Sequence, residues 1–260
     1  MTTHIITEHF NSPAWVPLQA RQFERHVRGE YRTYTCLEGI EDRSYGRYFT
    51  RVVEGRGGHA GKMNYLARVA LEDASDDDLI MFIDGDAFPV TNLSDKVDGW
   101  LSEAPLAAIR RDENLGDPQP HPCFCVTTAR FWKSLRGEWS GGYAWQARDG
   151  TLRTDVGANL LYGLKAAEVS WKPLLRTNQH DLHPVFFGVY AHTVYHHGRG
   201  FRRGLSRQDS VRAPRKGGLR YRLWRRRRAA ELDDVSEQVF DRLSRDCDSL
   251  EWLGEPGPAR

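Results

Sequence analysis

The stretch from Asp76 to Val90 reads DDDLIMFIDGDAFPV and carries the clearest structural signal in the chain. Its centre, Leu79 to Ile83, is a continuous apolar run, which is typical of a strand buried on both faces of a mostly parallel sheet. The run ends directly in Asp84-Gly85-Asp86. Two carboxylates at the carboxyl end of a buried strand can converge on one point, and the glycine between them lets a ligand approach the backbone.

This pair of carboxylates, Asp84 and Asp86, predicts a site for a divalent cation. Carboxylates held close together are costly unless a cation neutralises them. Oxygen ligands favour a hard ion such as Mg²⁺ or Mn²⁺. The plain alternative is that the two residues only form a turn after the strand.

Strand and helix signals alternate along the rest of the chain. Apolar and β-branched runs predict strands over residues 5–7, 31–37, 79–83, 106–109, 124–127, 171–175 and 185–195. Helical spacing predicts helices over 14–27, 62–71, 94–103, 128–135 and 155–167, the first capped by Ser12 and the third by Ser94. The predicted fold class is therefore α/β, with a mostly parallel sheet sandwiched by helices and ligands at the carboxyl ends of the strands.

Charge is distributed unevenly over the 260 residues. Residues 199–228 hold 13 Lys or Arg against the single acid Asp209, which leaves 24 basic and 34 acidic residues elsewhere. We therefore predict an acidic domain over 1–203 and a basic helical extension over 204–260. Residues 219–243 have the pattern of a basic amphipathic helix, which can lie on an anionic membrane or simply pack on the body. No nucleic-acid-binding module is recognisable, so nucleic acid is not an expected partner.

Three features predict a cytoplasmic location, with membrane association only through the basic helix. No stretch approaches the roughly 18 uncharged apolar residues that cross a bilayer. The start, MTTHIITEHF, lacks the basic and then apolar layout of a secretory signal. The four Cys are too few and too scattered for a disulfide framework.

Several elements occur in an order that resembles the nucleotide-sugar-dependent glycosyltransferases of the GT-A fold, in particular the D-x-D-containing enzymes like those of family 2. The elements are the Gly61-Lys62-x-Asn64 helix start, the D-x-D of Asp84 and Asp86, the helix at Asp155 and the late pair His196 and His197. The resemblance spans roughly residues 4 to 203. It implies a GT-A type sheet and a divalent ion, Mn²⁺ or Mg²⁺, held by the two Asp and bridging the diphosphate of the sugar donor. Such an ion stabilises the negative charge that develops on the leaving diphosphate.

The same resemblance assigns roles near the late His pair. Either His196 or His197 completes the metal shell or touches the diphosphate, and because neighbours on a strand point to opposite faces, we expect only one of them to do so. Arg199 and Arg202 are implied as clamps for the phosphate oxygens. The alternative is an ordinary surface loop that happens to be basic.

Further donor and acceptor residues follow from the resemblance. Lys62 and Asn64 would line the donor site, and Asp42, just after the second strand, would hold the base or ribose. Asp155, at a predicted helix start, would remove the proton from the acceptor hydroxyl. Asp155 can equally be a helix N-cap, and the Gly-rich stretch before Lys62 can be a plain loop.

The sequence thus predicts a metal-dependent glycosyltransferase that moves a sugar from a nucleoside diphosphate sugar to a saccharide, a lipid-linked or a small-molecule acceptor. One alternative is a non-catalytic protein that binds phosphate, nucleic acid or a membrane surface. Another is a haloacid dehalogenase-like phosphatase, which also places D-x-D after an apolar strand. Those phosphatases want Thr or Val two residues past the second Asp, and here that position is Phe88.

Overall fold

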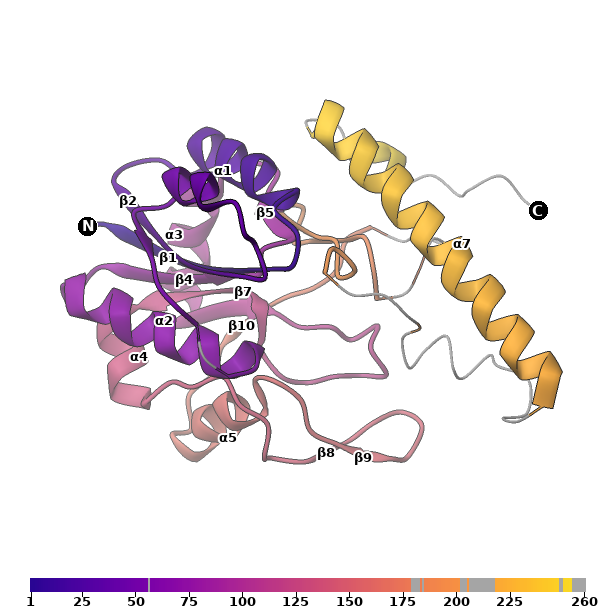
Figure 1. Cartoon of the computed structure of the whole chain (residues 1–260). Coiled ribbons are helices and arrows are strands. Elements are labelled where there is room, and N and C mark those ends of the chain that lie inside the picture. Colours follow the sequence, from indigo (N-terminus) through magenta and orange to yellow (C-terminus); the bar gives the residue numbers. More distant parts are fainter. Residues whose placement is uncertain are drawn as a thin grey trace.

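A seven-stranded sheet forms the centre of the structure, a computed structural model that describes residues 1–55, 57–178, 183, 185–201, 205, 218–247 and 250–253 (Figure 1). The strand order is β10-β6-β7-β4-β1-β2-β3, in which β7 runs antiparallel to both neighbours and all other pairs are parallel. The strands are β1 (Thr3–Phe10), β2 (Tyr31–Glu38), β3 (Arg51–Val52), β4 (Leu79–Ile83), β6 (Leu106–Ile109), β7 (His121–Thr128) and β10 (Lys172–Leu174). The predicted α/β class with a mostly parallel sheet is confirmed.

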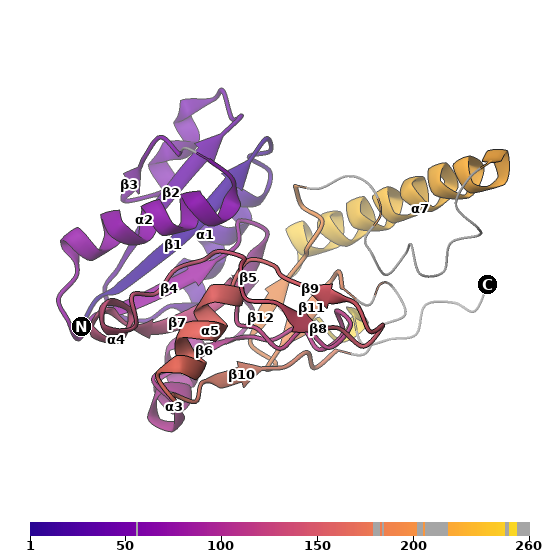
Figure 2. The same cartoon turned by 90° about the horizontal axis from the view of Figure 1, so that it is seen from below.

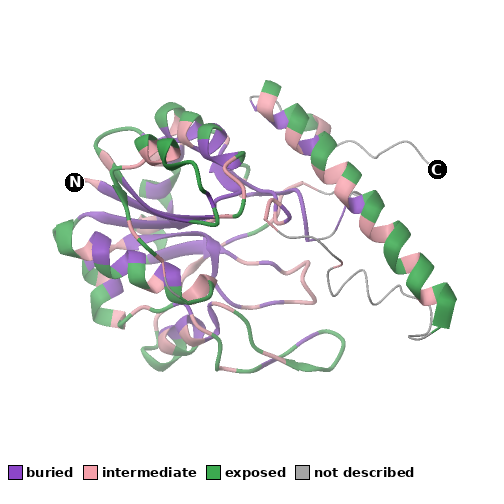
Figure 3. Ribbon diagram, in the orientation of Figure 1, coloured by how far each residue is buried: buried purple, intermediate pink, exposed green. Residues whose placement is uncertain are grey.

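Helices cover both faces of this sheet, and strand β4 shows why. Its residues alternate between two buried clusters, with Ile80 and Phe82 in one and Leu79, Met81 and Ile83 in the other. Helices α1 (Trp15–His26) and α3 (Leu93–Glu103) pack against one face. Helices α2 (His59–Asp73), α4 (Ala129–Leu135) and α5 (Ala158–Ala166) pack against the other, which the view from below brings to the front (Figure 2). The sheet between them is buried (Figure 3).

A second, antiparallel sheet lies at the carboxyl edge of the first. Its order is β11-β12-β5, and its strands are β5 (Ala87–Pro89), β11 (Gly188–Tyr190) and β12 (Val194–His196). A short pair, β8 (Trp145–Gln146) and β9 (Leu152–Arg153), and the 3-10 helices η1 (Arg43–Tyr48) and η2 (Glu251–Leu253) complete the described elements. Because β5 starts one residue after Asp86, the small sheet reaches the D-x-D turn directly.

Helix α7 (Gly218–Arg245) lies beside the small sheet (Figure 1). Its residues Leu232, Val239 and Leu243 are buried in one cluster with Trp15 and Phe88. The described residues contain no helix that is both long and apolar enough to span a membrane. The predicted boundary at residue 203 falls outside the described residues, so the division into two domains stays a prediction, as does the cytoplasmic location.

Several predicted boundaries were wrong. Helix α1 begins at Trp15 with Ala14 at the N-cap position. Asn92 occupies the N-cap position of α3 without a side-chain capping hydrogen bond, and Ser94 instead accepts a hydrogen bond from the backbone amide of Arg28. Residues 185–195 are not one strand but a hairpin, since Ala191 and His192 adopt positive φ angles between β11 and β12.

Helix α5 also begins later than predicted. It starts at Ala158, behind Gly157 at φ +101°. Residues other than glycine avoid that backbone conformation, so the chain changes direction there. Asp155 therefore lies ahead of the helix and is not its first residue.

Candidate metal centre

The Asp84-Gly85-Asp86 turn follows β4 without an intervening residue. It closes with a hydrogen bond in which the Ala87 amide donates to the Asp84 carbonyl at 2.9 Å. A Cβ atom at Gly85 would lie 2.2 Å from the backbone oxygen of Glu8 at the end of β1. Only glycine fits this close approach of two backbones, so the turn stays tight and both Asp side chains leave it on the same side.

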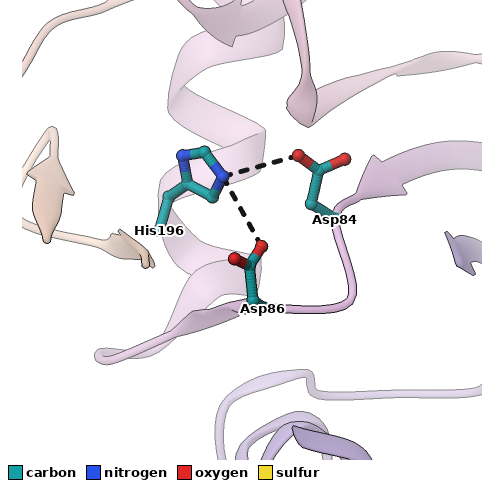
Figure 4. Close-up of side chains that lie close together, drawn as sticks. All are labelled: Asp84, Asp86 and His196. Atoms are coloured by element: carbon teal, nitrogen blue, oxygen red, sulfur yellow. Dashed lines mark ion pairs between the residues drawn. The ribbon is translucent and has the colours of Figure 1, made fainter. Parts of the chain in front are cut away.

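His196 joins the two carboxylates because β12 pairs with β5. The pairing places His196 opposite Ala87, next to the turn. Its Nε2 lies 3.4 Å from Asp84 Oδ2 and 3.6 Å from Asp86 Oδ1 (Figure 4). Ligand atoms of the three residues all lie within 4.8 Å of one another. Asp86 and His196 are each only 4% exposed, whereas the Asp84 side chain keeps 21%.

Strong electrostatic coupling ties these groups together. Burial by itself raises the pKa of Asp84, but His59 and His196 outweigh it and hold the pKa of this carboxyl well below its ordinary value. Burial by itself lowers the pKa of His196, but Cys123, Asp84 and Asp86 raise it to about 10. The imidazolium of His196 thus acts as the positive charge between two carboxylates.

The ligand atoms of Asp84, Asp86 and His196 suit a divalent ion, which would replace the proton of the His196 imidazolium as the positive charge. Two carboxylate oxygens and one imidazole nitrogen are ligands that Mn²⁺ accepts, and the carboxylates also suit Mg²⁺. Among the described residues, His196 Nδ1 is buried without a hydrogen-bond partner, and Asp84 Oδ1 has only an ion-pair contact, with His59. Asp84, Asp86 and His196 would hold the ion and leave its remaining positions for oxygen atoms of a ligand.

A second pair of residues, Glu8 and His59, supports Asp84 and was missed from the sequence. His59 in the first turn of α2 lies with Nδ1 2.9 Å from Glu8 Oε2 and with Nε2 3.3 Å from Asp84 Oδ1. Each oxygen of Asp84 therefore faces a different imidazole, His196 or His59. Side chains that orient a metal ligand in this way also tune the affinity for the metal. The available signal was an acid at the end of β1 and a His inside the Gly-rich stretch before Lys62.

The side chain of Gln19 in α1 fixes the Asp84-Gly85-Asp86 turn through hydrogen bonds. Its amide nitrogen donates to the carbonyls of Asp84 and Ala87 at 2.8 and 2.7 Å, and its amide oxygen accepts from Thr7 and faces His9 Nε2 at 3.1 Å. Since the amide oxygen is an acceptor, His9 donates from Nε2. The turn is thus fixed by buried hydrogen bonds that the sequence pattern does not reveal.

Neutral His9 makes the protein sensitive to acid. Burial lowers the pKa of His9 to about 4, below its ordinary 6.5. The unfolded chain therefore binds this proton first, and we expect about 3 kcal/mol of stability to be lost as the pH falls from 6.5 to 4. Urea unfolding of wild type and His9→Gln across this pH range checks the effect. The free energy of unfolding should fall less steeply with decreasing pH in the variant, by a slope that corresponds to about one proton. Equal slopes would rule it out.

The structure gives Lys62 and Asn64 partners of their own. Lys62 is buried, with Nζ 2.6 Å from Glu8 Oε1 and a second ion pair to Glu38. Asn64 binds the backbone of Trp139 with both ends of its amide, at 2.6 and 3.0 Å. Both residues lie near the carboxyl edge of the sheet, and their contact with a donor stays a prediction.

The side chains of Asp42 and His197 lie apart from the Asp84, Asp86 and His196 group, although the His197 amide donates to the Asp86 carbonyl at 3.0 Å. Exposed Asp42 caps η1 by accepting from the Ser44 amide at 2.9 Å. His197 is buried against Trp15 and hydrogen-bonds to Ser236 of α7 at 2.7 Å. As alternation along the strand predicts, only one His of the pair, His196, reaches the carboxylates.

The structure describes one of the two Arg that were predicted to clamp phosphate. Arg199 is 4% exposed and donates to Asp233 of α7 at 2.6 Å, so it fastens that helix to the loop after β12. Arg202 lies outside the described residues. Phosphate binding by either stays a prediction.

Asp155 belongs to a second polar group, with Asp117 and His121. The Asp155 carboxylate is half exposed and lies 3.9 Å from Arg111 Nη2, and Arg111 donates to His121 at 2.7 Å. Burial first, and then Arg111, lower the pKa of His121, so its imidazole is neutral. The structure does not bring Asp155 into the Asp84 group, and a role in removing a proton stays a prediction.

No family model and no curated protein sequence matches the chain. Among solved structures it is similar to S. aureus TarS 1-349 in complex with UDP-GlcNAc, at 13% identity and TM-score 0.40 over 54% of this chain and 49% of that one. It is also similar to the mannosyltransferase PcManGT from Pyrobaculum calidifontis in complex with GDP-Man and Mn²⁺, at 14% identity and TM-score 0.41 over 53% of this chain and 47% of that one. A third similar structure is the galactosyltransferase LgtC in complex with donor and acceptor sugar analogs, at 14% identity and TM-score 0.39 over 68% of this chain and 76% of that one. The chain spans about half the length of the first two proteins. Likenesses at this level leave the function to be argued from the residues of the site.

Proposed function

We propose that the chain is a metal-dependent glycosyltransferase of the GT-A type that uses a nucleoside diphosphate sugar. The observation that carries this proposal is the group of Asp84, Asp86 and His196 at the carboxyl edge of a mostly parallel sheet, where such folds bind their ligands. Three protein ligands leave room on a divalent ion for the oxygens of a diphosphate. Bound there, Mn²⁺ or Mg²⁺ supplies positive charge for the leaving diphosphate.

The side chains around the site have separate tasks in this proposal. Asp84 and Asp86 hold the ion, and His196 is its third protein ligand. Glu8 holds His59 in place, and His59 in turn orients Asp84. The Asp155 carboxylate, half exposed, is the group that takes the proton from the acceptor hydroxyl. Without Asp155 in that task, a retaining reaction is the alternative, and the stereochemistry of the product distinguishes the two. The acceptor is a saccharide, a lipid-linked or a small molecule.

A phosphatase mechanism fits this geometry poorly. It needs Asp84 as a free nucleophile, but both oxygens of that carboxylate face an imidazole. Phe88, at the position where those phosphatases carry Thr or Val, is fully buried in β5.

Thermal unfolding with a panel of ligands tests the proposal. We expect UDP, GDP, UDP-GlcNAc or GDP-Man to raise the melting temperature only when Mn²⁺ or Mg²⁺ is present, by about 5–10 °C at a hundredfold excess over Kd. Each responding nucleotide sugar is then incubated with the protein and the metal, and release of the nucleoside diphosphate is measured. No shift with any nucleotide and metal, across uridine, guanosine, adenosine, cytidine and thymidine diphosphates, would contradict the proposal.

A further inference from the structure

Helix α7 has two halves with different surroundings. The second half is packed on the body, where Leu232, Val239 and Leu243 are buried. Arg199 donates to Asp233 at 2.6 Å, and His197 hydrogen-bonds to Ser236 at 2.7 Å. These contacts fix the direction of the whole helix relative to the strand that carries His196.

The first half of α7, residues 218–231, extends beyond the body; we call it the basic half of α7. In both views the end near residue 218 lies far from the sheet (Figures 1 and 2), and this half is exposed or half-buried throughout (Figure 3). Leu219 is 72% exposed and Leu223 56%. Residues four apart lie on the same face of a helix, so these two leucines form one apolar patch in solvent.

Two arginines, Arg226 and Arg227, flank this patch on the helix surface, and an aromatic pair lies on the opposite side of the helix. Tyr221 and Trp224 stack with their ring centroids 6.2 Å apart. The half carries six arginines against one acid, Glu231, which pairs with Arg228 at 3.1 Å. The arginines are Arg220, Arg222 and Arg225–Arg228.

This combination suits the interface of a lipid bilayer. Leucine side chains enter the acyl boundary, and the rings of Tyr221 and Trp224, about one helix diameter away, would lie at the level of the headgroups, which Trp and Tyr favour. Arginines all around the helix axis reach the headgroups because their long apolar stems extend past the apolar patch. The phosphates of a nucleic acid could pair with the arginines, and its bases could stack on the aromatic rings, but it offers no apolar phase for Leu219 and Leu223.

We propose that the basic half of α7 docks the protein on an anionic phospholipid bilayer. The second half of the helix, tied to residues 197 and 199, then carries the Asp84, Asp86 and His196 group near the membrane surface. The docking does not depend on the proposed transferase activity, so either can fail without the other.

Vesicle flotation of the full chain tests the docking. We expect binding to vesicles of phosphatidylcholine with about one third phosphatidylglycerol, weak binding to phosphatidylcholine alone, and loss of binding at high salt, since salt screens headgroup charge. Each charge removed should weaken binding about fivefold. Arg226→Glu with Arg227→Glu therefore weakens it by at least about 25-fold. Arg68→Glu with Lys96→Glu, the same charge change on exposed positions of α2 and α3, should leave it within a few-fold.

The apolar patch has its own variant. Leu219→Ser with Leu223→Ser keeps every charge and should still weaken binding about tenfold or more, because two leucine side chains leave the acyl boundary. Far-ultraviolet circular dichroism confirms that both double variants remain folded. Equal binding to neutral vesicles, no binding to either vesicle, or wild-type binding by both double variants would overturn the proposal. A single-stranded oligonucleotide that binds more tightly than anionic vesicles at the same salt would also overturn it.

Discussion

Asp86→Asn is expected to abolish the metal-dependent response to nucleoside diphosphates and to reduce turnover of the donor by about 10²–10³-fold. The Asp86 carboxylate contributes one ligand oxygen to the group, while its other oxygen accepts from the Gly200 amide at 2.8 Å. Asn keeps the shape and an acceptor for that amide but removes the charge that binds the ion. Asp84→Asn should have an effect of the same size, because Asp84 faces the same nitrogen of His196.

Isothermal titration with Mn²⁺ measures this change without requiring the acceptor. Asp77→Asn is the matched control, since Asp77 lies ahead of the other end of β4 and is 86% exposed in an ion pair with Arg130. Asp155→Asn should retain Mn²⁺ and diphosphate binding and lose only transfer. If Asp84→Asn and Asp86→Asn both bind Mn²⁺ as wild type does, the two carboxylates are a structural turn and the proposed ion site is wrong.

Lys62→Met is expected to destabilise the fold by about 3–5 kcal/mol near neutral pH, which would make Lys62 primarily a structural residue. Its ammonium group lies between Glu8 and Glu38, and both Lys62 and Glu8 have side chains only 4% exposed. Among the described residues, removing the cation leaves the buried Glu8 carboxylate with His59 as its one remaining ion-pair partner. The loss should shrink at lower pH, where Glu8 can take up a proton.

Urea unfolding of a double-mutant cycle separates this effect from a role in donor binding. Glu8→Gln combined with Lys62→Met removes both charges and should recover more than half of the loss. The opposite outcome is informative as well. A Lys62→Met protein with wild-type stability but without nucleotide binding would show that the lysine serves the donor.

Local patterns were sufficient wherever a few neighbouring residues decide the structure. Strand β4 spans Leu79–Ile83, as its apolar run predicts, and the helix pattern before it corresponds to α2 (His59–Asp73), within a few residues at each end. The carboxylates after β4 were identified in the same way. Where the sequence analysis missed, as at the start of α5, the backbone at Gly157 depends on close contacts with distant residues, such as the carbonyl of Pro120.

The composition of the metal centre required contacts between distant segments. Two adjacent His were equivalent in the sequence, and the pairing of β12 with β5 selected His196 for the carboxylates. Glu8 and His59 gave no motif, because a single acid after β1 and a His in a Gly-rich loop are common. They became part of the site only when α2 packed across the ends of β1 and β4.

Neighbouring residues were enough to predict the α/β class, the buried central strand and the D-x-D turn at its end, because side-chain periodicity and the place of a glycine act within a few residues. Three further features depend on contacts across the fold: the imidazole that meets the two carboxylates, the Glu8 and His59 pair that orients Asp84, and the two carboxylates that neutralise Lys62. Those outcomes depend on distances of a few ångströms between segments far apart in the chain. Such distances are set by strand pairing and by packing of the whole core, which no local pattern encodes.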